Sequence, residues 1–173
     1  MPEENLLRIS GLVNDSIVDG PGMRFTIFTQ GCPHHCPGCH NPQTHDFEGG
    51  TLITAEELLK KLRRNPLLSG VTLSGGEPFC QAAFFPPFLD AVHKMGLNVF
   101  AYSGYTFEEL FARSQSDSAT REMLARCDVL VDGPFLLAER DLTLRFRGSR
   151  NQRVLDVARS LSEGRAVRAV LPD

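Results

Sequence analysis

Hydrophobic segments that suit strands alternate along this chain with amphipathic segments that suit helices. The expected strands cover residues 6–13, 23–29, 71–73, 97–102 and 128–132. These segments are rich in the β-branched and aromatic residues that are typical of strands. Because helical stretches of about ten residues separate the later strands, as in βαβ units, the pattern predicts an α/β fold with a parallel sheet.

Short capping signals mark the boundaries of the predicted helices. Thr54–Glu57 and Thr106–Glu109 both have the S/T-x-x-E spacing of a capping box, so we predict that a helix begins at each. Pro86 or Pro87 suits the first turn of another helix, which is expected to continue to Met95 and to end at Gly96. A further helix is expected over residues 119–126.

Beyond Pro134 the pattern is weaker. Residues 142–146 alternate like a strand, and residues 153–159 fit either a strand or a helix. Residues 165–171 are expected to form one more strand. The C-terminal part is therefore the least defined part of the prediction.

Segments with polar or reactive residues follow the predicted strands. They are a cysteine-rich loop after residue 29 and the segments Ser74–Pro78, Ser103–Tyr105 and Asp132–Pro134. In parallel α/β folds, ligands bind at the carboxyl ends of the strands. We therefore expect these segments to share one rim of the sheet.

Length and composition restrict the class of protein. A chain of 173 residues favours a single domain over residues 1–173, and it is too short for a complete eight-stranded α/β barrel of about 250 residues. The net charge is −3, which argues against a nucleic-acid partner, since such a partner usually needs a basic face. Without a basic leader or a long apolar run, we expect no signal peptide, no membrane span and a cytoplasmic location.

The cysteines carry the clearest chemical signal. Cys32, Cys36 and Cys39 fall within eight residues, whereas Cys80 and Cys127 stand alone. An odd number of cysteines without a secretion signal is a poor disulfide framework, and clustered thiols in a reducing compartment usually bind metal or take part in catalysis. We interpret Cys80 and Cys127 as small buried hydrophobic residues.

Two metal sites fit the cysteine triplet. Zinc would need a fourth ligand, which one of the nearby histidines can supply: His34, His35, His40 or His45. An iron–sulfur cluster also binds thiolates, and three cysteines on a cubane cluster would leave one iron open. The spacing alone leaves both interpretations open.

The order of two motifs resembles a known superfamily. The spacing Cys32-x3-Cys36-x2-Cys39 after a strand resembles the signature of the radical S-adenosylmethionine enzymes, and Ser74–Pro78 resembles their glycine-rich motif. The resemblance implies a shortened, open partial (β/α) barrel. It also implies that the triplet holds a 4Fe–4S cluster, whose fourth iron is chelated by S-adenosylmethionine.

The resemblance also implies where the cofactor lies. The residues expected around S-adenosylmethionine are Gly38, Cys39, His40, Asn41, Ser74, Gly75, Gly76 and Glu77. Asp132 is added because it ends a strand at the predicted rim, where a carboxylate can meet a ribose or a cation. A simple turn role for Asp132 before Gly133 stays equally open.

Further segments narrow the resemblance to activating enzymes. Val18–Phe25 resembles the segment before the cluster in activases of glycyl-radical enzymes. Cys36–Pro42, Val129–Phe135 and Arg147–Arg153 are similar to the activating proteins of anaerobic ribonucleoside-triphosphate reductases. The resemblance covers about residues 17–154.

Two positions depart from the wider superfamily. Gly38 stands where an aromatic residue often precedes the third cysteine, and glycine there matches the reductase activators. Pro134 stands where some relatives have a lysine after the Asp-Gly pair, so no charged cofactor contact is carried over to this position.

The resemblance implies a function in radical chemistry. The expected protein substrate is an anaerobic ribonucleoside-triphosphate reductase, on which the chain would install a glycyl radical, and the expected electron donor is a reduced flavodoxin-type protein. The residues expected to contact the partner are Asp19, Gly20, Arg147 and Asn151. The alternatives are an activase of another glycyl-radical enzyme, such as pyruvate formate-lyase, and a non-catalytic zinc-stabilised binding module.

Overall fold

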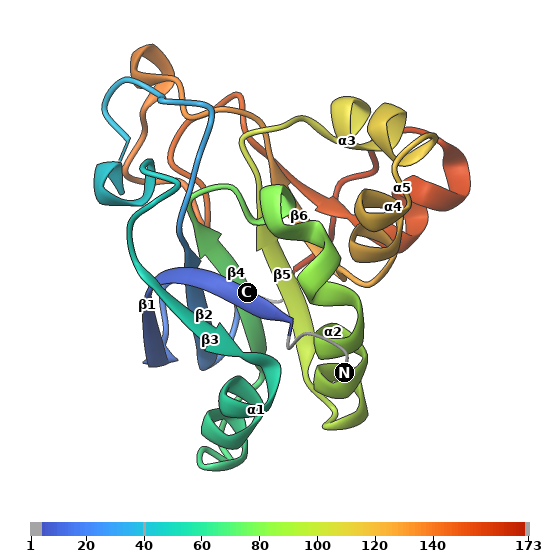
Figure 1. The fold of residues 1–173 in the computed structure, drawn as a ribbon. Coiled ribbons are helices and arrows are strands. Elements are labelled where there is room, and N and C mark those ends of the chain that lie inside the picture. The colour runs from blue at the N-terminus through green and yellow to red at the C-terminus, as the bar shows by residue number, and fades with distance from the viewer. Residues whose placement is uncertain (1–4, 40, 172–173) are drawn as a thin grey trace.

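The protein forms a single mixed sheet with helices packed against it (Figure 1). The structure is a computed structural model and describes residues 5–39 and 41–171. Within these ranges, seven strands have the order β3-β1-β2-β4-β5-β6-β7. They are β1 (Leu6–Ser16), β2 (Arg24–Thr29), β3 (Thr51–Thr54), β4 (Gly70–Gly75), β5 (Asn98–Tyr102), β6 (Val129–Asp132) and β7 (Arg153–Asp156).

The middle of the sheet is parallel and its edges are antiparallel. Strands β2, β4, β5 and β6 pair in parallel, as the sequence predicts. Strands β1 and β3 on one side and β7 on the other run antiparallel to their neighbours. Within the described ranges the edge strands β3 and β7 do not pair with each other. The fold is therefore the shortened, open α/β barrel that the resemblance implies.

Helices follow the strands and enclose the core. They are α1 (Ala55–Arg63), α2 (Phe85–Lys94), α3 (Phe107–Ser114), α4 (Ser118–Ala125) and α5 (Val157–Glu163), with short 3₁₀ helices η1 (Pro42–Thr44), η2 (Pro78–Phe84) and η3 (Leu137–Glu139). Figure 1 shows α2 in front of β5 and the α3–α5 group beside it. Among the described residues no helix is long and apolar enough to cross a lipid bilayer.

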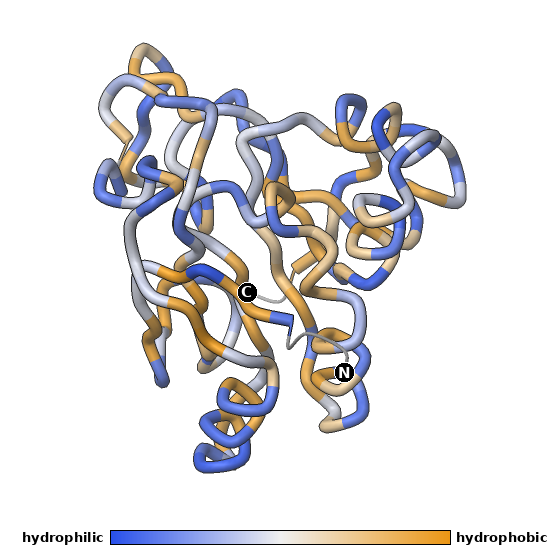
Figure 2. The backbone as a smooth tube through the Cα atoms, in the orientation of Figure 1, coloured by the Kyte–Doolittle hydropathy of each residue, from blue (hydrophilic) through white to orange (hydrophobic). Residues whose placement is uncertain are grey.

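The side chains of each strand alternate between the core and the opposite face. On β2, Phe25 and Ile27 are fully buried in the apolar core. Thr26 and Phe28 alternate with them along the strand and therefore point to the other face of the sheet, where Phe28 lines a cavity. Figure 2 shows hydrophobic positions gathered along the strands, with the two colours alternating around α1.

The predicted caps are present at two helix starts. Thr54 Oγ1 accepts a hydrogen bond from the Glu57 amide at 3.1 Å. Thr106 makes the full capping box, because Thr106 Oγ1 accepts from the Glu109 amide and the Glu109 carboxylate accepts from the Thr106 amide. Both helix starts predicted from the capping spacing are therefore confirmed.

Other predicted elements differ from the structure. Residues 142–146 form turns instead of a strand, because Asp141 accepts a hydrogen bond from the Thr143 amide and Phe146 has a positive φ of 64°. Residues 165–171 contribute only one isolated bridge, from Arg168 to Leu155. Residues 153–159 form both predicted alternatives in succession, β7 and the start of α5. The short strand β3 was not expected.

A buried arginine holds the loop before β2. Arg24 is fully buried, and its guanidinium donates to Thr72 Oγ1 at 2.7 Å, to the carbonyl of Pro21 at 3.1 Å and to Asn98 Oδ1 at 2.6 Å. Burial lowers the pKa of Arg24 to about 10, so the side chain stays charged at neutral pH. Gly20 packs on it, because a Cβ at Gly20 would lie 2.7 Å from Arg24 Cδ.

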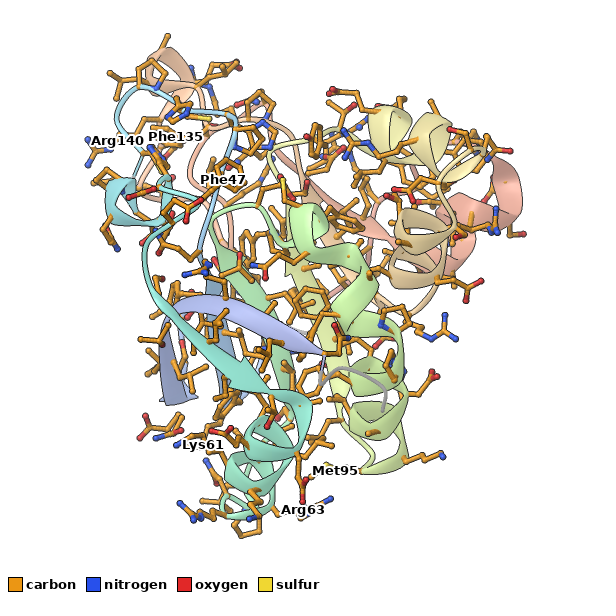
Figure 3. The ribbon with its side chains drawn as sticks, in the orientation of Figure 1. Phe47, Lys61, Arg63, Met95, Phe135 and Arg140 are labelled. Carbon is orange, nitrogen blue, oxygen red and sulfur yellow. The ribbon has the colours of Figure 1, made fainter. Side chains whose placement is uncertain are left out.

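We predict that Arg24→Lys lowers the free energy of unfolding by about 2 kcal/mol or more. A lysine ammonium cannot replace the planar fork of donors, so buried acceptors lose their partners. Urea denaturation of the variant and of Arg63→Lys, an exposed arginine labelled in Figure 3, measures the difference. Equal stability of the two variants would contradict the role given to Arg24.

Candidate functional site

The loops after the parallel strands converge on one cavity. Its volume is about 440 Å³, and each of the parallel strands β2, β4, β5 and β6 contributes lining residues from its carboxyl end or the loop that follows. These include Cys32 after β2, Ser74 on β4, Ser103 after β5 and Gly133 after β6. The structure thus brings together the segments that the sequence places on a common rim.

The cysteine triplet lies on the wall of this cavity. Cys32, Cys36 and Cys39 all line it as free thiols. The amide of Asn41, which also lines the cavity, lies 3.4 Å from Cys39 Sγ as a donor. Burial raises the pKa of Cys32, so a bound metal would have to supply the positive charge that favours its thiolate.

Three free thiols on one cavity fit an iron–sulfur cluster, which is held by cysteine thiolates. No three His, Cys, Asp or Glu side chains in the described part of the chain form a group that could hold one metal ion. A tetrahedral zinc site would bring its sulfur ligands to within about 3.8 Å of one another, given zinc–sulfur bonds of about 2.3 Å. A cubane of four irons spreads its thiolate ligands further apart, and the cavity provides room for it.

A histidine next to the thiols supports a polar occupant. His45 lines the cavity, and its Nε2 is buried without a hydrogen-bond partner, which distinguishes it from the other described side chains. Burial lowers the pKa of His45, so the imidazole is neutral at pH 7. Since buried polar groups are normally paired, an orphaned nitrogen beside three thiols indicates a partner that the protein alone does not supply.

The glycines after β4 allow close contact with the cysteine loop. Ser74, Gly75 and Gly76 line the cavity. The Gly76 amide donates to the carbonyl of Thr29 at 2.8 Å, and a Cβ at Gly76 would lie 2.4 Å from the carbonyl oxygen of Gly31. Any larger residue at Gly76 would push the two loops apart. Because glycine has no side chain, Gly75 and Gly76 also leave room for a ligand to approach the backbone.

Glu77 has a different environment from its neighbours. It is fully buried and is not among the residues that line the cavity. Its carboxylate accepts from His34 Nε2 at 2.7 Å, from the Ser103 hydroxyl at 2.9 Å, from the Gly104 amide at 2.8 Å and from the Phe79 amide at 3.2 Å. A carboxylate has about four lone-pair sites, so these donors occupy its capacity. Direct pairing with a cofactor ammonium group would require one of them to leave.

Asp132 is also turned into the protein. It is buried at 1% exposure, and its carboxylate accepts from the Phe107 amide at 2.7 Å and from Arg153 Nε at 3.1 Å. Arg153 also pairs with the exposed Glu108 at 2.7 Å, and the hydrogen bonds with Asp132 raise the pKa of Arg153. Asp132 therefore joins the start of α3 to β7, and its neighbour Gly133 lines the cavity instead.

The loop between β6 and β7 forms another part of the cavity wall. Arg147, Gly148 and Gln152 line it, and Arg147 Nη1 donates to the carbonyl of Gln152 at 2.6 Å. Asn151 does not line it, because Asn151 Nδ2 donates to the carbonyl of Pro134 at 2.7 Å and ties the loop down. Among the described lining residues, Arg147 is the sole arginine or lysine.

The segment before β2 forms another wall. Asp19 lines the cavity, and Asp19 Oδ2 accepts from the hydroxyls of Ser16 at 2.5 Å and Thr26 at 3.1 Å. Val18 also lines it and is 72% exposed. Gly20 packs against Arg24 and is absent from the described lining.

Of four other positions named in the sequence analysis, all but His40 can be compared with the structure directly. Gly38 has a φ of 75° and does not line the cavity, and a Cβ there would lie 2.9 Å from Leu137 Cδ1, so the turn itself requires glycine. His40 lies outside the described residues. Cys127 is buried as predicted, whereas Cys80 is exposed, since the buried positions of η2 are its neighbours.

Sequence reasoning missed the aromatic walls of the cavity. The aromatic lining residues that it did not assign to the site are Phe28, Tyr102, Phe135 and Phe146. Phe28 and Tyr102 alternate with core positions on β2 and β5, so the two-residue period of a strand was the available signal. Phe135, labelled in Figure 3, lies on a loop for which the sequence has no such period.

Comparisons with known proteins agree with this geometry. A family model described as "4Fe-4S single cluster domain" matches residues 18–155. The anaerobic ribonucleoside-triphosphate reductase-activating protein of Haemophilus influenzae is 33% identical over 144 residues, covering 79% of this chain and 89% of the relative. That of Escherichia coli K12 is 33% identical over 145 residues, covering 79% and 90%.

Two further matches cover smaller shares of this chain and of the matched proteins. The pyruvate formate-lyase-activating enzyme of Clostridium pasteurianum is 44% identical over 96 residues, covering 53% of this chain and 40% of the relative. A crystal structure of QueE from Escherichia coli covers 58% of this chain and 53% of its own, with a TM-score of 0.46 and 19% identity.

We predict that Asp132→Asn lowers the free energy of unfolding by about 3 kcal/mol, because it breaks a buried ion pair and leaves Arg153 poorly matched. Glu108→Gln removes the exposed partner of the same arginine and should change stability by about 0.5 kcal/mol or less. Denaturant unfolding of both variants measures the contrast. If Asp132→Asn instead keeps its stability and loses cofactor binding, the structural role is wrong.

Proposed function

The chain belongs to the 4Fe-4S single cluster domain family and to the anaerobic ribonucleoside-triphosphate reductase-activating proteins, enzymes of the radical S-adenosylmethionine type, and we propose that it installs a glycyl radical on such a reductase. The observation that carries the proposal is the convergence of all three clustered cysteines with the Ser74–Gly76 backbone on one cavity. A cluster bound there would face a cofactor seated on the glycine loop.

The lining residues divide into two groups by their chemistry. Cys32, Cys36 and Cys39 would hold the cluster, and the backbone of Ser74–Gly76 would seat the methionyl end of S-adenosylmethionine. Arg147 supplies a positive charge on the opposite loop, where it suits the carboxylate of that methionyl group.

When bound, the reduced cluster would donate one electron to S-adenosylmethionine, yielding methionine and a 5′-deoxyadenosyl radical that takes a hydrogen atom from a glycine of the partner. The chain's own part is to place these groups and keep other hydrogen donors away. Phe28, Phe135 and Phe146 give the cavity apolar walls, which would limit the access of water to a reactive carbon radical. Asn41 is placed for a polar contact beside Cys39.

The partner would approach from the side where apolar residues remain exposed. Ile17 and Val18 are 74% and 72% exposed, and they precede Asp19 on the cavity wall. A protein segment carrying the target glycine can cover such residues, whereas nucleic acid would need a basic face. Asn151 would act on the partner indirectly, because its side chain is bonded to Pro134.

A pyruvate formate-lyase is the second candidate substrate. The high local identity to the Clostridium pasteurianum enzyme favours it, but that match covers 40% of the relative, against 89% and 90% for the reductase-activating proteins. We therefore place the reductase first. The proposal also includes a reduced flavodoxin-type electron donor and a cytoplasmic setting, since thiolate ligands require a reducing compartment.

The substrate is tested by glycyl-radical formation. The reduced protein, loaded with iron and sulfide and supplied with S-adenosylmethionine, should generate the electron paramagnetic resonance signal of a glycyl radical on an anaerobic ribonucleoside-triphosphate reductase. Under the same conditions a pyruvate formate-lyase should give little or no signal. The reverse pattern would assign the chain to the second candidate.

The ligand assignment is tested by a matched pair of cysteine variants. We expect Cys36→Ala to lose most of its bound iron and sulfide and to form no methionine from S-adenosylmethionine. Cys80→Ala should retain both, because Cys80 is exposed and outside the described cavity lining. Metal analysis after anaerobic purification provides the readout, and full iron content in Cys36→Ala would refute the assignment.

A further inference from the structure

The buried carboxylate of Glu77 connects three loops of the site. His34 donates to it from inside the cysteine loop, and Ser103 and Gly104 donate from the loop after β5. Glu77 itself ends the glycine loop after β4, and its amide donates to the carbonyl of Gly31 at 2.8 Å. Three of the loops that border the cavity are therefore joined at one point.

His34 is fitted into this junction by packing as well as by its hydrogen bond. Its ring contacts Tyr105 edge-on with centroids 4.6 Å apart. A Cβ at Gly104 would lie 2.4 Å from the His34 ring, so glycine is needed for the ring to reach Glu77. Because a carboxylate only accepts, the Nε2 of His34 carries the hydrogen in this bond.

Because of the position of His34 in the sequence, its hydrogen bond with Glu77 links the cysteine loop to the glycine loop. His34 lies between Cys32 and Cys36, and it lines the cavity beside them. Of the donors to Glu77, it is the one that comes from the cysteine loop. Without it, Glu77 would stay bonded to its other partners, and the cysteine loop would keep backbone contacts but lose its side-chain anchor to the glycine loop.

We propose that His34 is a positioning residue, which fixes the cysteine loop against the glycine loop through Glu77 and so sets the cluster at the right distance from the methionyl seat. The inference deepens the proposed function, on which it rests for the identity of both bound groups. It also gives Glu77 a role that explains its burial, because the carboxylate organises the loops from behind the cavity wall.

The test compares two substitutions of His34. His34→Gln keeps an amide N–H donor of similar reach, whereas His34→Leu removes the donor and keeps an apolar side chain. His35→Leu is the matched control, because His35 belongs to the same loop and is exposed, and its ring faces His45 instead of a carboxylate. Each variant is loaded with iron and sulfide, and the dissociation constant for S-adenosylmethionine is measured by equilibrium binding.

We expect His34→Leu to bind S-adenosylmethionine about tenfold more weakly or worse, as is typical when a residue that orients a ligand loop is lost. The change that the cofactor produces in the electron paramagnetic resonance spectrum of the reduced cluster should shrink in parallel. His34→Gln and His35→Leu should resemble the unmodified protein in both measurements. If His34→Leu loads less iron, His34→Gln must restore the loading.

Two results would overturn the positioning role. One is cofactor binding and spectra in His34→Leu that equal those of the unmodified protein. The other is an equal defect in His34→Gln, which would assign the effect to the ring and not to the hydrogen bond. Failure of the proposed function has a separate signature, because the unmodified protein would then bind no cluster or no S-adenosylmethionine.

Discussion

The arrangement of the site depends on a buried negative charge. Glu77 is removed from water, and a carboxylate in that position is stable only when protein donors replace its hydration. The donors come from the cysteine loop, the loop after β5 and the start of η2. Each of these segments must therefore stay within hydrogen-bond distance of Glu77 to stabilise the charge. This requirement fixes the positions of the loops that form the cavity wall.

A second buried charge acts at the opposite end of the parallel strands. Arg24 begins β2 and is satisfied by Thr72, Asn98 and the carbonyl of Pro21. The segment that it anchors then runs to Asp19, which reaches the cavity. The two ends of the sheet are thus connected by polar contacts on the face that the core does not use.

The sequence predicted what local signals specify. Strand periodicity, the Thr106 capping box and the strand-to-loop order placed the cysteine loop and the glycine loop on one rim, and the structure confirms this arrangement. Strand periodicity and capping motifs do not predict the direction in which a side chain at the end of a loop points. Glu77 turns inward because of Ser103, and Asp132 turns inward because of Arg153, a residue 21 positions away. Strand β3 was missed because its four residues are stabilised by pairing with β1 and carry no long pattern.

The open sheet is a physical requirement of the proposed reaction. A radical formed inside a closed barrel could act on a small molecule. A glycine of another protein is part of a longer chain, so a segment of that chain must enter the cavity with it. Here the antiparallel strands β3 and β7 end the sheet without meeting in the described chain, and loops complete the cavity wall where further strands would stand. Loops fastened by side chains, as Asn151 fastens the loop after η3 to Pro134, can border an opening without closing it. The sheet, which is open in the described chain, therefore suits access of the macromolecular substrate of the proposed function.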